Sequence, residues 1–124
     1  MACRDAPAEL IEAVSSGLLQ PDMSLRSAVV VAIAEDRRND RGWPEVMFAA
    51  LVTTSDNPNG VPAVWAAAAT GGPIFAVDGA AREVSDWTSA VRVDSRAHQI
   101  KNMLGGYPET AEARRCAGRQ PERP

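Results

Sequence analysis

The sequence predicts an all-α protein, a small bundle of four to five helices with a disordered C-terminal tail. Two observations favour this fold class. Apolar residues recur at the three- and four-residue spacing of helices. The core must also be built from aliphatic residues, because 45% of the 124 residues are hydrophobic but only 5% are aromatic. We expect one helical domain over residues 1–104 and a flexible tail over 105–124. An α+β fold with short strands near 28–34 and 73–78 is the alternative.

Two helices are predicted in the first third of the chain. The first, Asp5–Gly17, opens with Asp5 as a cap and Pro7 in the first turn, and its apolar residues follow at helical spacing. The second, Asp22–Arg38, is apolar on most of its circumference, which is typical of a central helix. Its Val29–Val31 run is equally consistent with a buried strand, because short apolar runs do not distinguish the two.

Start and stop signals predict two further helices in the middle of the chain. Trp43–Glu45 opens a third helix, with Pro44 in the first turn and a carboxylate near the positive end of the helix dipole. Ser55–Gly60 contains nearly every turn-forming residue type and is predicted to be a loop. Val61–Thr70 is rich in alanine and predicts a fourth helix that ends at two glycines.

The last third of the chain contains an ambiguous segment, a helix and a tail. Pro73–Gly79 is either a short strand or an apolar loop. A longer helix begins near Asp78 and presents Trp87 as its largest core side chain. Tyr107–Pro124 has three prolines and almost no large apolar residue, so we expect it to be mobile.

The sequence shows no catalytic or metal-binding motif. The single histidine, His98, has no glycine-framed Ser or Cys beside it. Cys3 and Cys116 lie near opposite ends with no second ligand at metal-binding spacing, and no glycine pattern matches a phosphate-binding loop. We therefore expect no enzyme activity, no cofactor and no metal. We expect two free thiols, with a disulfide only where the termini converge.

The length of the apolar runs and the pattern of the first residues predict the cellular compartment. No apolar run approaches the length of a membrane-spanning helix, and Met1–Ile11 lacks the basic and then apolar pattern of a secretory leader. These features predict a cytoplasmic protein without a membrane partner.

Basic residues supply one candidate binding site, although the net charge is −3. Trp43 beside an arginine cluster would stack on an unpaired base while guanidinium groups contact phosphates. Its other interpretation is packing over the start of the third helix. The candidate nucleic-acid-binding residues are Arg37, Arg38, Arg41, Trp43, Arg92, Arg96 and Lys101.

Several short motifs follow one another between Pro21 and Val93: Asp22-x-Ser24-x-Arg26-Ser27, Ile33-Ala34, Arg41-Gly42-Trp43-Pro44-Glu45, Asn57-Pro58-Asn59-Gly60, Ala81-Arg82 and Asp86-Trp87. This stretch resembles the small helical domain that follows the primase-polymerase core in replication proteins of actinobacterial plasmids, phages and integrated elements. The resemblance implies a helical fold and a role near template DNA. The acidic metal-binding motifs of the polymerase core itself are absent from the chain.

Two functions are consistent with these features. The first is a small non-catalytic helical protein that mediates protein–protein interaction as an adaptor or regulator from a phage, plasmid or integrated element. It rests on apolar stripes that exceed the needs of one small core, and such an excess commonly serves a partner or self-association. The alternative is a DNA-binding accessory domain of a replication protein from a mobile genetic element.

Overall fold

A five-stranded antiparallel sheet forms the centre of the molecule, with its strands in the order β1-β2-β3-β4-β5. The computed structural model describes residues 3–37, 44–68, 74–86 and 106–119. Each strand pairs with its neighbour in sequence, so the sheet is a meander. The strands are β1 (Cys3–Asp5), β2 (Ser24–Ala32), β3 (Val46–Thr53), β4 (Val61–Ala67) and β5 (Phe75–Ala76).

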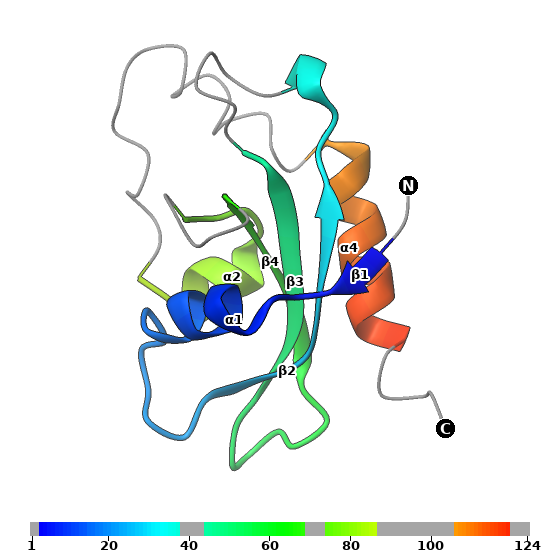
Figure 1. The fold of residues 1–124 in the computed structure, drawn as a ribbon. Helices are drawn as coiled ribbons and strands as arrows, with labels where there is room; N and C mark the ends of the chain where they lie inside the picture. The colour runs from blue at the N-terminus through cyan, green and yellow to red at the C-terminus, as the bar shows by residue number, and fades with distance from the viewer. Residues whose placement is uncertain (1–2, 38–43, 69–73, 87–105, 120–124) are drawn as a thin grey trace.

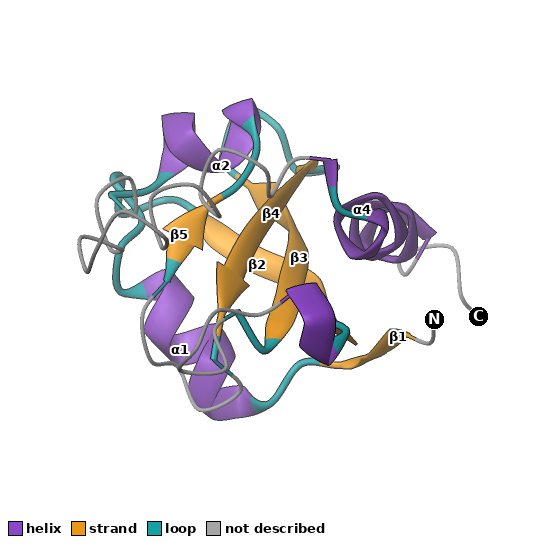
Figure 2. Ribbon diagram, turned by 90° about the horizontal axis from the view of Figure 1, so that it is seen from above, coloured by secondary structure: helices purple, strands orange, loops and turns teal. Residues whose placement is uncertain are grey.

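Helices cover both faces of this sheet. The helices α1 (Ala8–Ser15) and α2 (Gly79–Val84) lie on one face, and α4 (Pro108–Arg119) lies on the other (Figures 1 and 2). A short 3₁₀ turn, η1 (Glu35–Arg37), follows β2. The described residues therefore form three layers, with the sheet in the middle.

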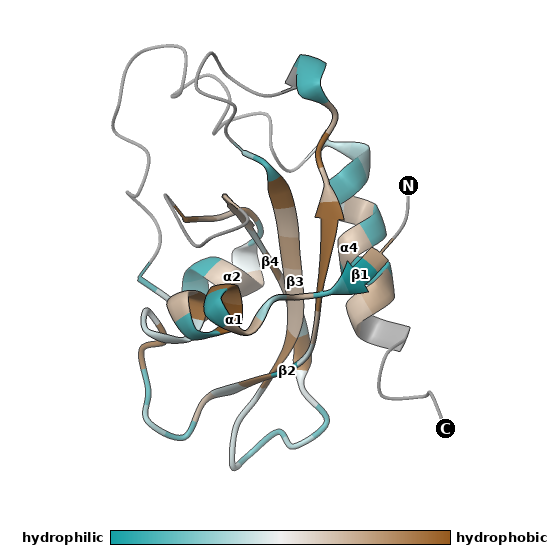
Figure 3. Cartoon of the chain, in the orientation of Figure 1, coloured by the Kyte–Doolittle hydropathy of each residue, from teal (hydrophilic) through white to brown (hydrophobic). Residues whose placement is uncertain are grey.

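The central strands are apolar on both sides because both of their faces are covered. Successive side chains of a strand point to opposite faces. In β3, Met47 and Ala49 belong to the cluster under α4, whereas Phe48 and Ala50 belong to the cluster under α1 and α2. Hydrophobic residues accordingly follow one another without interruption along β3 (Figure 3).

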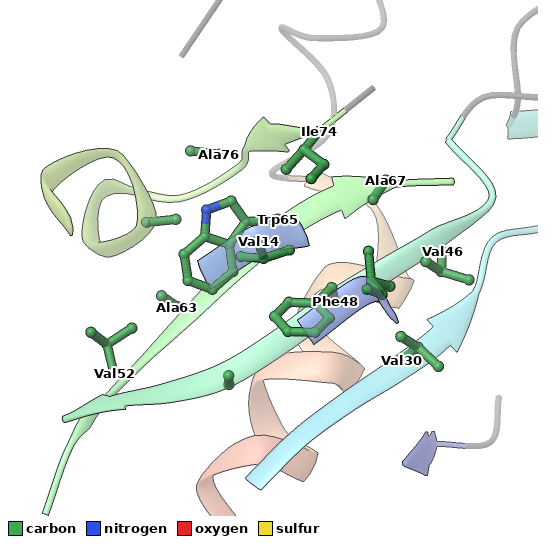
Figure 4. Packing of buried hydrophobic residues seen from close by; sticks show 13 residues of the cluster. Val14, Val30, Val46, Phe48, Val52, Ala63, Trp65, Ala67, Ile74 and Ala76 are labelled. Carbon is green, nitrogen blue, oxygen red and sulfur yellow. The ribbon is translucent and has the colours of Figure 1, made fainter. Parts of the chain in front are cut away.

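The face under α1 and α2 contains Trp65 and Phe48, the two largest fully buried side chains. Trp65 and Phe48 pack edge to face, with ring centroids 5.7 Å apart and an interplanar angle of 63° (Figure 4). The Trp65 indole Nε1 donates a hydrogen bond to Ser85 Oγ at 2.9 Å, and Ser85 Oγ donates in turn to Ala81 O at 2.6 Å. The buried indole N–H is therefore satisfied.

The face under α4 combines valines and alanines with the larger Ile33, Met47 and Phe75. Ala113 and Ala117 of α4 are fully buried against it, and Tyr107 packs at the start of the helix. A disulfide joins Cys3 of β1 to Cys116 of α4, with 6.6 Å between the Cα atoms, and these are the only two cysteines in the chain. The prediction of two free thiols is wrong, because α4 returns to the edge strand at the N-terminus (Figure 1).

The prediction of an all-α helical bundle is wrong. Where helices were expected over Asp22–Arg38, from Trp43–Glu45 onwards and over Val61–Thr70, the described residues form β2, β3 and β4. Tertiary pairing overrides the helical spacing, because each strand satisfies its backbone groups by bonding to a neighbouring strand. The alternative placed strands near 28–34 and 73–78, and β2 and β5 occupy these regions.

Predictions at the ends of the chain have mixed outcomes. The helix over Asp5–Gly17 is confirmed in its central part as α1, but Asp5 lies in β1 and does not cap it. The disordered tail is wrong for the described residues after Gly106, because they form α4 and pack on the sheet. The helix start near Asp78 is confirmed as α2, and Trp87 lies outside the described residues.

Candidate functional site

The predicted nucleic-acid-binding residues lie almost entirely outside the part of the chain that the structure describes. Arg37 is the last residue of η1 and follows two carboxylates, Glu35 and Asp36. The remaining candidates lie in the undescribed segments: Arg38, Arg41, Trp43, Arg92, Arg96 and Lys101. The nucleic-acid site therefore stays a prediction.

A groove with apolar walls lies between the β3–β4 hairpin and α2. The groove is small and open to solvent, and it lies below the size range of pockets for drug-sized ligands. The groove is lined by Val52, Thr54, Asn57, Val61, Ala80, Glu83 and Val84.

The hairpin wall of the groove is fixed by its turn. Val52 and Val61 are register partners at the end of β3 and β4 that the turn connects. Thr54 and Asn57 exchange backbone hydrogen bonds of 3.2 Å in both directions across the turn. Gly60 follows with a φ of +84°, and a Cβ there would lie 2.9 Å from Leu51 Cβ, so this position requires glycine. The turn therefore holds its lining residues in one conformation.

The helical wall is fixed by Asp78, which caps α2. Its Oδ1 accepts hydrogen bonds from Ala81 N at 2.9 Å and from Val64 N of β4 at 3.3 Å. Its Oδ2 accepts from the Arg114 guanidinium of α4 at 3.1 Å. One carboxylate thus connects α2, β4 and α4, and it sets the position of Ala80 and Val84 in the groove.

Exposed aliphatic residues gather around the groove. Within the described residues, Leu19 and Val61 are the large hydrophobic side chains that are exposed, by 56% and 45%. Val61 lines the groove itself. Leu19 N donates a 2.9 Å hydrogen bond to Val84 O, which brings Leu19 next to the end of α2. Val61 therefore lines the groove together with Val84, and Leu19 is joined to Val84 through the backbone.

One carboxylate lines the groove and two more lie at the adjoining hairpin turn. Glu83 is part of the lining and is exposed. Asp22 Oδ2 accepts hydrogen bonds from Ser55 N at 3.2 Å and Ser55 Oγ at 2.9 Å, which places Asp22 beside the hairpin turn. These bonds lower the pKa of the Asp22 carboxyl, so it is ionised at neutral pH. Asp56 follows in the same turn and is exposed.

Comparison with known proteins gives no relative: no family model matches the chain, and neither does any curated protein or solved structure. The motif residues Asp22–Ser27 form a turn and the start of β2, where the resemblance to replication proteins implies a helix. Across the described ranges, no helix has both the length and the apolar character needed to cross a membrane.

Sequence reasoning did not find this groove. Its lining comes from three segments that meet only when β3 pairs with β4 and α2 packs on β4. The local signal was the loop Ser55–Gly60, which was predicted and forms the hairpin turn. The exposure of Val61 was not predicted, because Val61–Thr70 was interpreted as an alanine-rich helix.

Proposed function

We propose that this protein is a binding domain that recognises a segment of a partner protein in the groove between the β3–β4 turn and α2. The observation that carries the proposal is the placement of both exposed aliphatic residues, Leu19 and Val61, next to Val84 of that groove. Contiguous exposed apolar surface with a polar rim is typical of protein interaction sites.

The groove has the properties of a site for one aliphatic side chain. Exposed aliphatic surface is unfavourable by about 25 cal/mol per Å², and a partner side chain that covers Val61 and Val84 recovers part of this free energy. The walls are held by the Asp78 cap and the Gly60 turn, so binding orders little of the chain. A rigid apolar groove of this size therefore favours a short peptide segment.

The charge at the mouth selects the partner. Glu83 in the lining and Asp22 and Asp56 at the adjoining turn give this end of the molecule negative charge, and a basic residue beside the aliphatic anchor complements it. A second copy of this chain would bring the same carboxylates together in a symmetric contact, and each copy carries a net charge of −3. The occupant that we propose is thus a peptide with an aliphatic side chain next to Lys or Arg.

The test is a fluorescence anisotropy titration with two peptide pools. Both pools contain one Leu or Ile in a neutral background, and they differ only in whether Lys or Glu flanks it. We expect the Lys pool to bind and the Glu pool not to bind. The variant Val61→Asp should abolish binding, and Glu83→Lys should weaken the Lys pool about tenfold and favour the Glu pool.

A matched control is Glu35→Lys. Glu35 is also exposed, but it lies in η1, which follows the end of β2 that is farthest from the groove. It should leave binding unchanged. Equal binding of both pools, or none, contradicts the proposal. The proposal is also contradicted if sedimentation shows that the chain self-associates and that Val61→Asp abolishes this self-association. In that case a second copy of the chain occupies the groove. Retention of DNA in a gel shift at low salt, with no peptide binding, favours the nucleic-acid alternative.

A further inference from the structure

Three metal-ligating side chains meet where the two ends of the described chain converge. Cys3 lies in the edge strand β1, and Cys116 lies in α4. Glu112 precedes Cys116 by four residues, so the two side chains share one face of the helix. One sulfur or carboxylate oxygen from each of the three residues lies within 4.8 Å of the others. Figures 1 and 2 both show β1 and α4 side by side at this place.

The spacing of these atoms matches the edges of a zinc tetrahedron. Glu112 Oε2 lies 3.7 Å from Cys3 Sγ and 3.7 Å from Cys116 Sγ. With Zn–S bonds near 2.3 Å and Zn–O bonds near 2.0 Å, tetrahedral geometry puts an oxygen and a sulfur ligand about 3.5 Å apart and two sulfur ligands about 3.8 Å apart. The carboxylate is therefore already in place, and only the two sulfur atoms have to separate.

The carboxylate is held in this position by its own helix. Arg115 Nε donates to Glu112 Oε1 at 3.2 Å, and its Nη2 contacts both carboxylate oxygens. A fixed outer partner of this kind orients a metal ligand. The two cysteines are half-buried and pack against the core cluster beneath α4, so protein covers one side of the sulfur atoms and the other side is open to solvent.

We propose that Cys3, Glu112 and Cys116 form a redox-gated zinc site. In the oxidised chain the disulfide occupies the two sulfur ligands. A dithiol reductant supplies two electrons and two protons, the S–S bond breaks, and the reductant leaves as its own disulfide. One Zn²⁺ then binds both sulfur atoms and the carboxylate, with water as the fourth ligand, and both thiol protons are released.

The reverse step returns the disulfide. A peroxide oxidant takes two electrons from the two thiolates and, with two protons, becomes water, while the S–S bond forms and zinc leaves. Both states connect β1 to α4 through the same residues. The site thereby reconciles a disulfide, which is rare in reducing compartments, with a chain expected to be cytoplasmic.

The test uses the full chain and Co²⁺, a spectroscopic substitute for zinc. We expect the chain reduced with a phosphine to bind one Co²⁺, with thiolate-to-metal charge-transfer bands and the intense d–d bands of tetrahedral cobalt. Binding of either ion to the metal-free reduced chain should release two protons, and Zn²⁺ should displace bound cobalt without further proton release. The oxidised chain should bind neither ion, and peroxide should expel the bound metal.

The variant that isolates the site is Glu112→Gln, because its disulfide and hence its oxidised fold are retained. In its reduced form we expect Co²⁺ to bind at least about tenfold more weakly. Glu9→Gln is the control, since Glu9 is exposed on α1 across the sheet. Unchanged affinity in Glu112→Gln, or reduced chain without thiolate bands, overturns the proposal. If reduction unfolds the chain, circular dichroism must show that zinc restores it, and failure to do so also overturns the proposal.

Discussion

The two faces of the sheet are built differently, although they share the same strands. The face under α1 and α2 contains Trp65 and Phe48, the two largest fully buried side chains. On the other face, α4 contributes the small side chains Ala113 and Ala117 to the hydrophobic core, whereas α1 contributes the larger Leu10 and Val14 to the first. A disulfide closes the second face only.

This difference shows two ways to fix a helix on a sheet. Large side chains bury more apolar area, so packing and the Trp65 hydrogen bond suffice to hold the first face. Alanines let α4 approach the sheet closely but bury little area each. We infer that the covalent link between Cys3 and Cys116 adds to the limited stability that the two buried alanines of α4 provide.

The largest effect should come from Trp65→Ala. Removing a fully buried indole leaves a cavity and should lower the free energy of unfolding by about 3–5 kcal/mol. The matched control is Val64→Ala, one residue away and on the other face, which should cost about 2 kcal/mol because fewer buried groups are removed. Chemical denaturation of both variants measures the difference. Equal losses would contradict the proposed contrast between the faces.

The next effect should come from the disulfide. Replacing both cysteines by serine frees a loop that spans 113 residues, and the loss of stability should be about 2–4 kcal/mol. The measurement is urea unfolding of the double variant under oxidising conditions. A variant as stable as the parent would show that the α4 face is held by packing after all.

A smaller effect is expected from Ser85→Ala, which sharpens the account of the first face. The change leaves the Trp65 Nε1–H without its buried acceptor, and this should cost about 1–3 kcal/mol. Ser16→Ala is the control, since Ser16 is exposed and its Oγ donates only to Ala13 O within the same helix. Thermal melts of the two variants compare them, and similar melting temperatures would contradict a role for the indole hydrogen bond.

The smallest effect concerns Asp22, which lies at the end of the sheet and belongs to neither face. The hydrogen bonds from Ser55 keep its pKa below the ordinary value of about 3.9. Its contribution to stability is therefore present above that value and is lost as the pH falls through the lower, folded pKa. Carboxyl NMR titration should show the low pKa and its rise in Ser55→Ala. An unchanged pKa in this variant would remove the hydroxyl as a cause.

Local signals in the sequence predicted turns and helix starts correctly, because these depend on few neighbouring residues. The loop Ser55–Gly60 and the start of α2 at Asp78 follow from turn and cap chemistry alone. The centre of α1 was also predicted from its apolar spacing. These elements need no information about which segments pair in the folded chain.

The strands were mistaken for helices for two physical reasons. A strand buried on both faces loses the alternation of polar and apolar residues, and β3 is the clearest case. In β2, the register shifts between Arg26 and Val29, and Ser27 has a positive φ of 57°. This bulge puts Leu25 and Ala28 into the same cluster at a three-residue spacing, which imitates a helix.

The groove and the cysteine cluster were beyond sequence reasoning because they depend on long-range contacts. Leu19 meets Val84, and Cys3 meets Cys116, only in the folded chain. The candidate nucleic-acid residues lie mostly outside the described segments, so that hypothesis stays a prediction. The sequence gives the types of these residues, but it does not give the distances between them in the folded chain.

Hydrogen exchange with and without a reductant tests the contrast between the two faces most directly. Amides of the oxidised and the reduced chain are compared by mass spectrometry in the presence of a metal chelator. We expect reduction to accelerate exchange in α4 while β3, β4 and α1 keep their protection, because only the α4 face depends on the cross-link. Unchanged exchange in α4, or a simultaneous loss of protection in β3 and α1, would contradict this account.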